Sequence, residues 1–442
     1  MTDSGAPARR PIRRHYADDT APVATRELWA WAMFDFANSG YTTVVITAVF
    51  NAYFVAVVAA GAASATFQWT AALALSYVLV MLSAPLIGAL ADQRASKKRW
   101  LALSSVVCVG ATAGLAGCGP GDVALALTLV VVSNAAFGTG ENLIAAFLPE
   151  LADEHALGRL SGYGWALGYV GGLLTLGLCL YWIQSADEAA RSAAVGQTML
   201  ITAVAFTLAA IPTFAFLVER QKPQAMSANR AFQAAWREVH ASLVSTDGLI
   251  DLRRFLACIV AYQAGVGTVI TVAAIYTQEA LGFSTADSIM LIMVVNLTAA
   301  VGAFAFGSIQ DRFGHKFGLG LSLILWLVAL GLLWASESRA VVWVAANLAG
   351  LCLGASQSAG RALVGWLCPA GRQAEVFGLW GLAVKLSMII GPLAYGLISW
   401  LAGDHRQAML ATAAFFIVGL LLLARVDVQR GRARALRGSV PT

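Results

Sequence analysis

Four charged side chains, Asp35, Glu141, Arg361 and Lys385, lie within long apolar stretches of the chain. A charge at the centre of a membrane costs at least ~2.5 kcal/mol, so such residues usually face a cavity or a partner. Lys385 follows Arg372 by ~20 Å of helix, somewhat past the middle of a ~30 Å hydrocarbon core. An ammonium at that depth is suited to hold a carboxylate or phosphate of a solute. The alternatives are a pair with a protein acid, or a neutral amine that results from desolvation.

A polar face runs along the first apolar stretch. Asp35, Asn38 and Thr42 recur at the i, i+3 and i+7 spacing of one helix face, and Tyr41 borders them. We expect this face to point inward, where Asp35 is suited to bind an amine or to carry a proton. The alternative is a hydrogen-bonded polar cluster that only holds helices together.

Glu141 and Arg361 lie at matching depths in two different apolar stretches. Each precedes the proline that ends its stretch, Pro149 or Pro369, by ~12 Å of helix. We expect an ion pair between them that acts as a gate at the cytoplasmic end of a cavity. A purely structural pair is the first alternative, and a proton relay through Glu141 is the second.

Uncharged and aromatic residues add to this set. Trp165 and Tyr169 lie one turn apart among glycines, so they either line a cavity or sit where helices pack closely. Asn142 and Asn347 supply further amides within apolar stretches. The residues expected to contact a solute are Asp35, Asn38, Tyr41, Trp165, Tyr169, Gln263, Asn296, Gln357, Trp380 and Lys385. Those expected to carry protons are Asp35 and Glu141.

The composition shows what must position these side chains. Of 442 residues only 12% are charged, 59% are hydrophobic, and the mean hydropathy is +0.72. Too few charges are present to cover a water-facing surface, which excludes an ordinary soluble protein. The sequence has no Gly-x-x-x-x-Gly-Lys-Ser loop, no His-Glu-x-x-His and no basic stripe, so we expect no enzyme, cofactor, metal or nucleic-acid site.

Twelve apolar stretches divide into two sets of six. They cover about 28–59, 69–91, 100–118, 122–147, 160–183, 195–218, 254–280, 287–310, 317–336, 340–368, 373–402 and 405–425. We therefore predict an all-α polytopic membrane protein with twelve transmembrane helices in two pseudo-symmetric six-helix bundles. The predicted units are a disordered tail at 1–27, bundles at 28–218 and 254–425, an interdomain loop at 219–253 and a basic tail at 426–442.

The distribution of basic residues predicts the orientation. Of the 29 lysines and arginines, only Arg191, Arg339 and Arg406 fall in loops on one side of these stretches. Positive residues favour the cytoplasmic side, so both termini and the interdomain loop are expected to be cytoplasmic. Arginine and alanine richness indicates a GC-rich bacterial genome, and hence the cell membrane.

The two halves repeat one another. Gly88 and Asp92 end the second stretch, and Gly307 and Asp311 end the eighth, at an offset of 219 residues. An aspartate that ends one helix can bind the N-terminus of a neighbouring helix and hold one conformation closed. We expect Asp92 with Arg94, and Asp311 with Arg312, to form such a latch; positive-inside anchoring alone is the alternative. Duplicated bundles of this kind commonly rock about a midplane site.

Two motifs place this pattern in a known group. The segment Gly307-x-x-x-Asp311-Arg312-x-Gly314-x-Lys316 resembles the loop signature of the major facilitator superfamily. MFDFANS at 33–39, LPE at 148–150 and GRLSGYGWALGY at 158–169 resemble its vacuole-effluxer branch. The resemblance implies export of small solutes, amino acids in the fungal members. One departure concerns Gln263-Ala264, where that branch tends to have Asn-Asp, so an acidic group is missing and the substrate and coupling ion are open.

We accordingly expect a secondary transporter that works by alternating access and exports a small amphoteric or anionic metabolite such as an amino acid. Coupling to protons and uniport both fit the residues. The expected partners are the solute, protons and membrane lipids, and the expected state is a monomer. The alternatives are a receptor or scaffold that does not transport, and a lipid-handling protein of the same fold.

Overall fold

The computed structural model describes residues 23–153, 155–221, 249–276, 283–336, 338–402 and 405–437, with residues 233, 236 and 237 between them. These residues form helices and no strands. Twelve helical segments among them are long and apolar enough to cross a membrane. The predicted all-helical fold with twelve spans is thus confirmed.

The first six spans form the N-terminal bundle. They are α1 (Thr25–Tyr41) with its continuation to Val58, α3 (Ala65–Gln93), α4 (Lys97–Gly114), α5 (Val123–Ala145), α7 (Leu157–Ser185) and α8 (Arg191–Phe216). The short α6 (Leu148–Leu151) follows α5. The C-terminal bundle comprises α10 (Ile250–Ile275), α11 (Thr285–Phe313), α12 (His315–Ala335), α13 (Arg339–Leu367), α14 (Gln373–Ala402) and the last span, α15 (His405–Ala411) with α16 (Ala413–Ala424).

Local sequence signals explain where some of these helices begin and end. The Ser284 hydroxyl accepts a hydrogen bond from the backbone N–H of Asp287 at 3.1 Å and so caps α11. That helix ends at Phe313, and the next residue, Gly314, has a φ of +94°, which is open to glycine but strained for other residues. Apolar side chains cover the outer faces: Leu82 is 75% exposed and Trp400 78%. In lipid this exposure carries no penalty, which explains the low charge content.

The first span leaves the α-helical form directly after its polar face. A π-helix covers Thr42–Ala48, the single turn α2 spans Phe50–Tyr53, and a second π-helix covers Phe54–Val58. The Thr47 hydroxyl donates to the Thr42 carbonyl at 3.0 Å within the first of these wider turns. Such segments are frequent at functional sites. Here the wider turns begin within two turns of Asp35.

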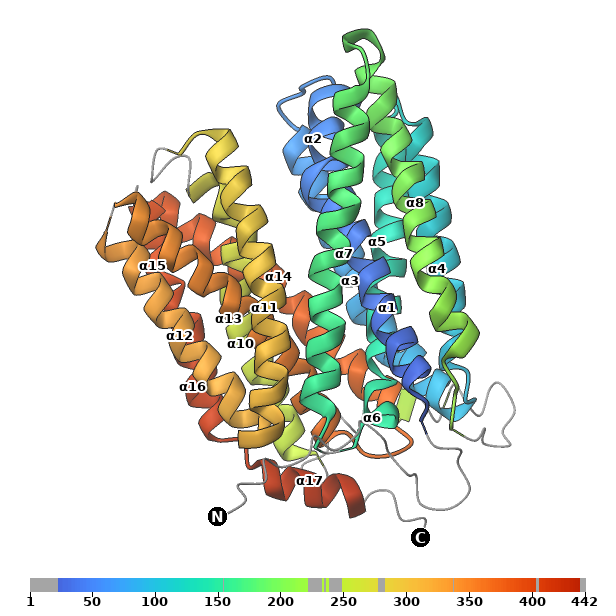
Figure 1. Cartoon of the computed structure of the whole chain (residues 1–442), viewed down its shortest axis with the longest axis vertical. Helices are drawn as coiled ribbons and strands as arrows, with labels where there is room; N and C mark the ends of the chain where they lie inside the picture. The colour runs from blue at the N-terminus through green and yellow to red at the C-terminus, as the bar shows by residue number, and fades with distance from the viewer. Residues whose placement is uncertain are drawn as a thin grey trace, which may run out of the picture.

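The two bundles meet at one end of the molecule. Figure 1 shows them converging at the end that carries α17 and separating at the opposite end. At the junction α3 packs against α14, and α7 packs against α11. Glycines allow this approach, because a Cβ at Gly88 would lie 2.1 Å from the Ala374 carbonyl oxygen, and one at Gly162 would lie 2.4 Å from that of Ala303. We call this junction the closed end.

The basic segment predicted after the last span, at 426–442, contains a helix that the sequence analysis did not predict. Residues Val428–Arg437 form a helix, α17, which lies across the closed end (Figure 1). Its small residues Gly431 and Ala435 are buried, and a Cβ at Gly431 would lie 2.5 Å from the Leu367 side chain. The Asp251 carboxylate accepts hydrogen bonds from Arg430 at 2.6 and 2.8 Å, which ties α17 to α10. Sequence periodicity alone did not reveal this contact.

The other predicted tail and the interdomain loop lie largely outside the described residues. Of the predicted tail at 1–27 the structure describes residues 23–27, and α1 already begins at Thr25. Of the predicted loop at 219–253 it describes 219–221 and 249–253, together with residues 233, 236 and 237. The loop's last residues belong to α10, which begins at Ile250.

Candidate functional site

The most connected side chain between the bundles is Arg361 of α13. Its guanidinium donates to the Asp35 carboxylate at 2.7 Å, to the Ser161 hydroxyl at 3.1 Å and to the Ser161 carbonyl at 2.9 Å. The indole rings of Trp31 and Trp165 flank it, with centroids 4.8 and 5.3 Å from the guanidinium carbon. Only 3% of the side chain is exposed. An arginine so held joins α13 to both α1 and α7.

The surroundings of Arg361 are shaped by α7 and α1. A Cβ at Gly164 would lie 2.2 Å from the Asp35 carboxylate and 2.6 Å from Arg361, so only glycine leaves room for the pair. The Trp31 indole N–H donates to the Ile144 carbonyl at 2.7 Å, which fixes that ring. The glycine-rich segment of α7 therefore serves this contact, besides packing helices.

A second ion pair joins α5 to α14. Lys385 donates to Glu141 at 3.0 Å, and the two side chains are 9% and 22% exposed. The rings of Tyr77 and Phe137 lie 5.7 and 5.5 Å from the ammonium. Glu141 is also close enough to Asp35 for their carboxylates to interact electrostatically. The two pairs thus form one cluster of four charges between the bundles.

The predicted pair between Glu141 and Arg361 is wrong. Each residue does cross from one bundle to the other, but Arg361 pairs with Asp35 and Glu141 with Lys385. The two positions are related by the internal repeat, so the pseudo-twofold axis gives them equal depth. Such residues touch only if they lie on the axis itself, which their depth does not determine. All four charges chosen from the sequence nevertheless belong to the cluster.

Buried polar atoms without a partner surround these pairs. Within the part of the chain that the structure describes, no hydrogen bond reaches the side-chain amide oxygen (Oδ1) of Asn38, the side-chain oxygen or nitrogen of Asn142, or the indole N–H of Trp165 or Trp380. All four side chains come from helices that carry the four charges or pack beside them. A Cβ at Gly381 would lie 2.2 Å from the Asn142 amide. Buried groups of this kind usually have a hydrogen-bond partner.

The other predicted amides divide into two groups. Gln263 donates to Gln357 at 2.6 Å, which joins α10 to α13. Asn296 and Asn347 each bond to a carbonyl of their own helix, that of Ile292 or Trp343, at 2.8 Å. These two amides therefore have a local structural use.

The predicted aromatic residues lie on either side of the charges. Tyr41 is buried, hydrogen-bonded to Ser133 at 2.8 Å and stacked on Phe137, which itself flanks Lys385. Trp165 and Tyr169 contact each other with centroids 5.9 Å apart. The Trp165 ring contacts Arg361, and the Tyr169 ring contacts that of Trp165.

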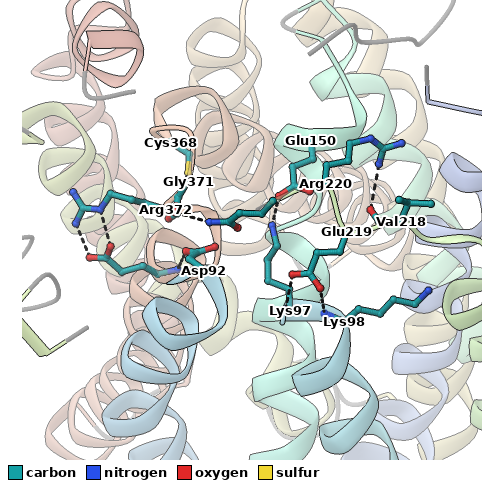
Figure 2. Close-up of polar contacts among 12 residues, drawn as sticks. Asp92, Lys97, Lys98, Glu150, Val218, Glu219, Arg220, Cys368, Gly371 and Arg372 are labelled. Atoms are coloured by element: carbon teal, nitrogen blue, oxygen red, sulfur yellow. Dashed lines mark hydrogen bonds and ion pairs between the residues drawn. The ribbon is translucent and has the colours of Figure 1, made fainter. Parts of the chain in front are cut away.

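Asp92 lies at the N-terminus of α14, in the closed end. Its carboxylate accepts a hydrogen bond from the Glu375 backbone N–H at 2.9 Å, and it is 4% exposed (Figure 2). Glu375 in turn binds Arg372 through two hydrogen bonds of 2.8 Å. A carboxylate at a helix N-terminus is favoured by the helix dipole. The end of α3 therefore bonds to the opposite bundle.

A buried network lies beside this contact and was not predicted. Lys97, fully buried, forms an ion pair with Glu150, and Glu219 accepts the first two backbone N–H bonds of α4 at 2.7 and 3.2 Å (Figure 2). Gln221 then donates to the Gly371 carbonyl at 2.9 Å in the other bundle. The start of the interdomain loop is thus fixed to both bundles. The sequence signal available for this network was Lys97, a basic residue close to the helix end that carries Asp92.

Asp311 occupies the equivalent place in the second repeat. It accepts hydrogen bonds from the backbone N–H groups of Gly158 and Arg159 at 2.8 and 3.1 Å, at the start of α7. The Arg159 guanidinium adds a bond of 2.9 Å. Both repeats therefore place the aspartate that ends one helix on the first turn of a helix in the opposite bundle.

The basic residues predicted to act with these aspartates do not contact them in the structure. Arg94 and Arg312 are exposed, and Arg312 lies over the Phe313 ring at 5.2 Å. Arg159 supplies the cation for Asp311, and Lys97 interacts electrostatically with Asp92. An exposed arginine is stabilised more by hydration than by an ion pair with a carboxylate that already accepts hydrogen bonds from backbone N–H groups.

Replacement of Asp311 by alanine is expected to loosen the closed end. Loss of a helix-capping carboxylate costs about 0.5–2 kcal/mol, and the bond to Arg159 is lost as well. We expect the Asp311→Ala protein to melt at a lower temperature in detergent than the wild type. Asp287→Ala is the control, because its carboxylate makes an exposed pair with Arg339 at 3.8 Å, and such pairs contribute little to stability. Equal melting temperatures for both variants would contradict a capping role.

The fold and the charge cluster define the class of protein. Two six-helix bundles that meet at repeated glycine–aspartate helix ends, with paired charges at membrane depth between them, are the architecture of a major facilitator transporter. No group of three or more metal-ligating side chains occurs among the described residues. The human organic anion transporter MFSD10 has a similar structure, with a TM-score of 0.73 and 17% identity over 90% of this chain and 99% of that one.

The chain belongs to a particular family within that class, the one described as "Vacuole effluxer Atg22 like", whose model matches residues 54–436. It is 26% identical to the uncharacterized MFS-type transporter YxiO of Bacillus subtilis, over 91% of this chain and 95% of that protein. It is also 26% identical to autophagy-related protein 22-1 of Neosartorya fischeri, over 63% of this chain and 49% of the relative. The chain thus spans about half the length of that fungal relative. The expected resemblance is confirmed, and these relatives are transporters rather than enzymes.

Proposed function

We propose that this transporter exports a small amphoteric or anionic metabolite, such as an amino acid, by alternating access across the cell membrane. The observation that carries the proposal is the cluster of Asp35–Arg361 and Glu141–Lys385 pairs. Each pair has one member in each bundle, so the bundles can part at this level only if both pairs break. A solute with a carboxylate and an ammonium offers each of these residues a replacement partner.

The geometry suggests how such a solute is held. Its carboxylate takes the place of the Asp35 carboxylate on Arg361, or that of Glu141 on Lys385, and its ammonium binds the carboxylate so released. The unpartnered side-chain oxygen of Asn38, the unpartnered amide of Asn142 and the indole N–H of Trp165 lie on helices next to the same charges. A charge-assisted bond of this kind contributes roughly twice a neutral one. The chemistry favours a zwitterion over a sugar.

Protons supply the proposed driving force. A proton on Asp35 or Glu141 neutralises the carboxylate and weakens its hold on Arg361 or Lys385. Entry of a proton from outside would then release the bundles in the same way as the solute does from inside. Uniport remains the alternative.

The orientation follows from the basic residues. With both termini in the cytoplasm, as the distribution of lysine and arginine predicts, the closed end is cytoplasmic. The structure then corresponds to a state that opens outward, with Asp92 and Asp311 acting as latches on the cytoplasmic side. Export would require these helix-end bonds to break when the solute enters from the cytoplasm.

The proposal is tested by binding of amino acids, dipeptides and small organic anions to the purified protein, measured by thermal shift. A ligand at 100-fold excess over its Kd stabilises by ~2.7 kcal/mol, so even a weak binder is visible. We expect a zwitterion to stabilise the wild type, and the shift to be lost in Lys385→Ala. Lys98→Ala is the matched control, because that amine donates to the Leu217 carbonyl at the closed end.

The double variant Glu141→Gln with Lys385→Met separates binding from folding, since it leaves no unpaired charge. It should melt near the wild-type temperature and still fail to respond to the zwitterion. A full response of this variant would place the binding site elsewhere. Stabilisation by lipid alone, with no response to any solute, would favour the lipid-handling alternative.

A further inference from the structure

A basic cavity of about 480 Å³ lies at the corner where α10, α12, α16 and α17 meet. Four cationic side chains line it, Arg254, Lys316, Arg425 and Arg430, with Asp427 as the acid in the lining. Most of its lining residues lie at the end of α16, in the turn that follows and at the start of α17, at the end of the C-terminal bundle that carries α17 (Figure 1). The cavity is a shallow depression that is largely open to its surroundings.

The cations in this cavity are only partly neutralised. Arg430 binds the Asp251 carboxylate, and this hydrogen bond raises the pKa of Arg430. Lys316 donates hydrogen bonds to the Val426 and Ala424 carbonyls at 2.7 and 3.2 Å. These neutral acceptors satisfy its N–H groups but do not neutralise its positive charge. The exposed Arg425 guanidinium has no ion-pair partner among the residues described. Four cations thus face two carboxylates, Asp427 and Asp251.

Apolar side chains continue from the cavity along the outer face of the bundle. Leu421 lies one helical turn before Arg425 on α16 and is 62% exposed, and Val418 and Ile417 beyond it are 46% and 48% exposed. On α12 Phe317 follows Lys316 directly and is 52% exposed. A ligand with a phosphate in the cavity would therefore lay its apolar part along α16 and α12. A free inorganic anion would not contact that apolar surface.

We propose that this cavity binds the headgroup of an anionic phospholipid, whose acyl chains lie on α16 and α12. Basic pockets at the cytoplasmic ends of transmembrane helices suit such headgroups. The lipid phosphate would join Arg425 and Arg254 to the Arg430 side chain of α17, and so help to hold α17 across the closed end. Arg437, exposed on the same helix, lies on the side of the membrane where anionic lipid would be bound.

The test titrates phosphatidylglycerol and phosphatidylcholine of equal chain length into the full-length protein in detergent, with thermal stability as the readout. Glycerol phosphate and inorganic phosphate form separate arms. We expect phosphatidylglycerol alone to stabilise the wild type. Its apparent affinity should fall about fivefold for each arginine removed, once in Arg425→Gln and twice in Arg254→Gln/Arg425→Gln. Added salt should weaken the effect.

Arg191→Gln is the matched control, because that exposed arginine begins α8 at the opposite end of the molecule. It should keep the wild-type response to phosphatidylglycerol. Equal stabilisation by phosphatidylcholine, or by inorganic phosphate, would overturn the proposal of a lipid site. An unchanged response in Arg425→Gln, whose guanidinium bonds to none of the described residues, would overturn the location. Neither result bears on solute transport between the bundles.

Discussion

Replacement of Arg361 by glutamine is expected to abolish solute transport and to lower stability together. The change removes the bond to Asp35 and both bonds to Ser161, and it leaves a carboxylate that is buried without its partner. Removing one partner of a buried pair costs about 3–5 kcal/mol. A lost charge-assisted contact to the solute costs ~2 kcal/mol or more, which is about 30-fold in affinity. Counterflow in proteoliposomes and melting in detergent measure the two effects.

The double variant Asp35→Asn with Arg361→Gln separates these effects. It leaves no unpaired charge, so most of the stability should return while transport stays absent. Arg361→Lys should also fail, because one ammonium cannot make the forked contacts to Asp35 and Ser161 between two indole rings. Full transport in Arg361→Lys would show that only a positive charge is needed. Full transport in the double variant would exclude the pair from the mechanism.

Replacement of Gly88 by valine is expected to prevent the bundles from meeting at the closed end. A Cβ there would lie 2.1 Å from the Ala374 carbonyl oxygen and 2.8 Å from the Glu375 nitrogen, and backbone atoms cannot turn aside. Overpacking costs about 1–3 kcal/mol even where neighbours yield. That energy shifts the ratio of closed to open molecules by about 5- to 150-fold. Transport should fall because one of the two states is lost.

The readout for Gly88→Val is the labelling rate of a cysteine placed at Ser358. This residue is buried between the bundles, where its carbonyl accepts from Ser161 at 2.9 Å. The native cysteines are all buried and supply the same background in each protein. Labelling should be slow in Ser358→Cys and faster when Gly88→Val is added. Gly177→Val is the control, since a Cβ there meets nothing within 4 Å. Equal labelling with and without Gly88→Val would contradict the account.

The twelve spans were predictable because lipid imposes a simple rule on sequence. A chain that crosses a membrane must satisfy its backbone polar groups within helices, so apolar length alone marks each span. Only details of conformation were missed, such as the π-helix after Tyr41 and the break at Thr412 between α15 and α16. Neither leaves a trace in hydropathy. The helix α17 was missed because its burial rests on two small residues, Gly431 and Ala435.

The charges of the site were predictable, but their partners were not. Asp35, Glu141, Arg361 and Lys385 stand out because each is costly in lipid. Sequence position gives the depth of a residue along its helix. It does not give the rotation of that helix or its neighbour, and these decide whether Arg361 meets Glu141 or Asp35. Ser161 was not predicted as a site residue. One of its two bonds to Arg361 comes from its backbone carbonyl, which the residue type does not reveal.

The helix-end aspartates show the same division. Asp92 and Asp311 were found from the repeat, and the general idea that each lies at a neighbouring helix N-terminus agrees with the bonds observed. The cations were assigned to Arg94 and Arg312 because these are adjacent in sequence. Arg159, which is distant in sequence from Asp311, makes the actual contact. Tertiary packing, rather than adjacency in sequence, therefore determines which cation contacts Asp311.

The most direct test of alternating access is a distance across the closed end, measured by spin labels at the exposed positions 94 and 312 in lipid bilayers. Position 94 directly follows α3 and position 312 lies in the last turn of α11, in opposite bundles, so the distance follows the separation of the bundles. With a zwitterion identified by thermal shift, we expect a second, longer distance to appear beside the first, and to be absent in the Glu141→Gln/Lys385→Met variant. A single distance that does not change when the bound zwitterion saturates the wild type would contradict the account.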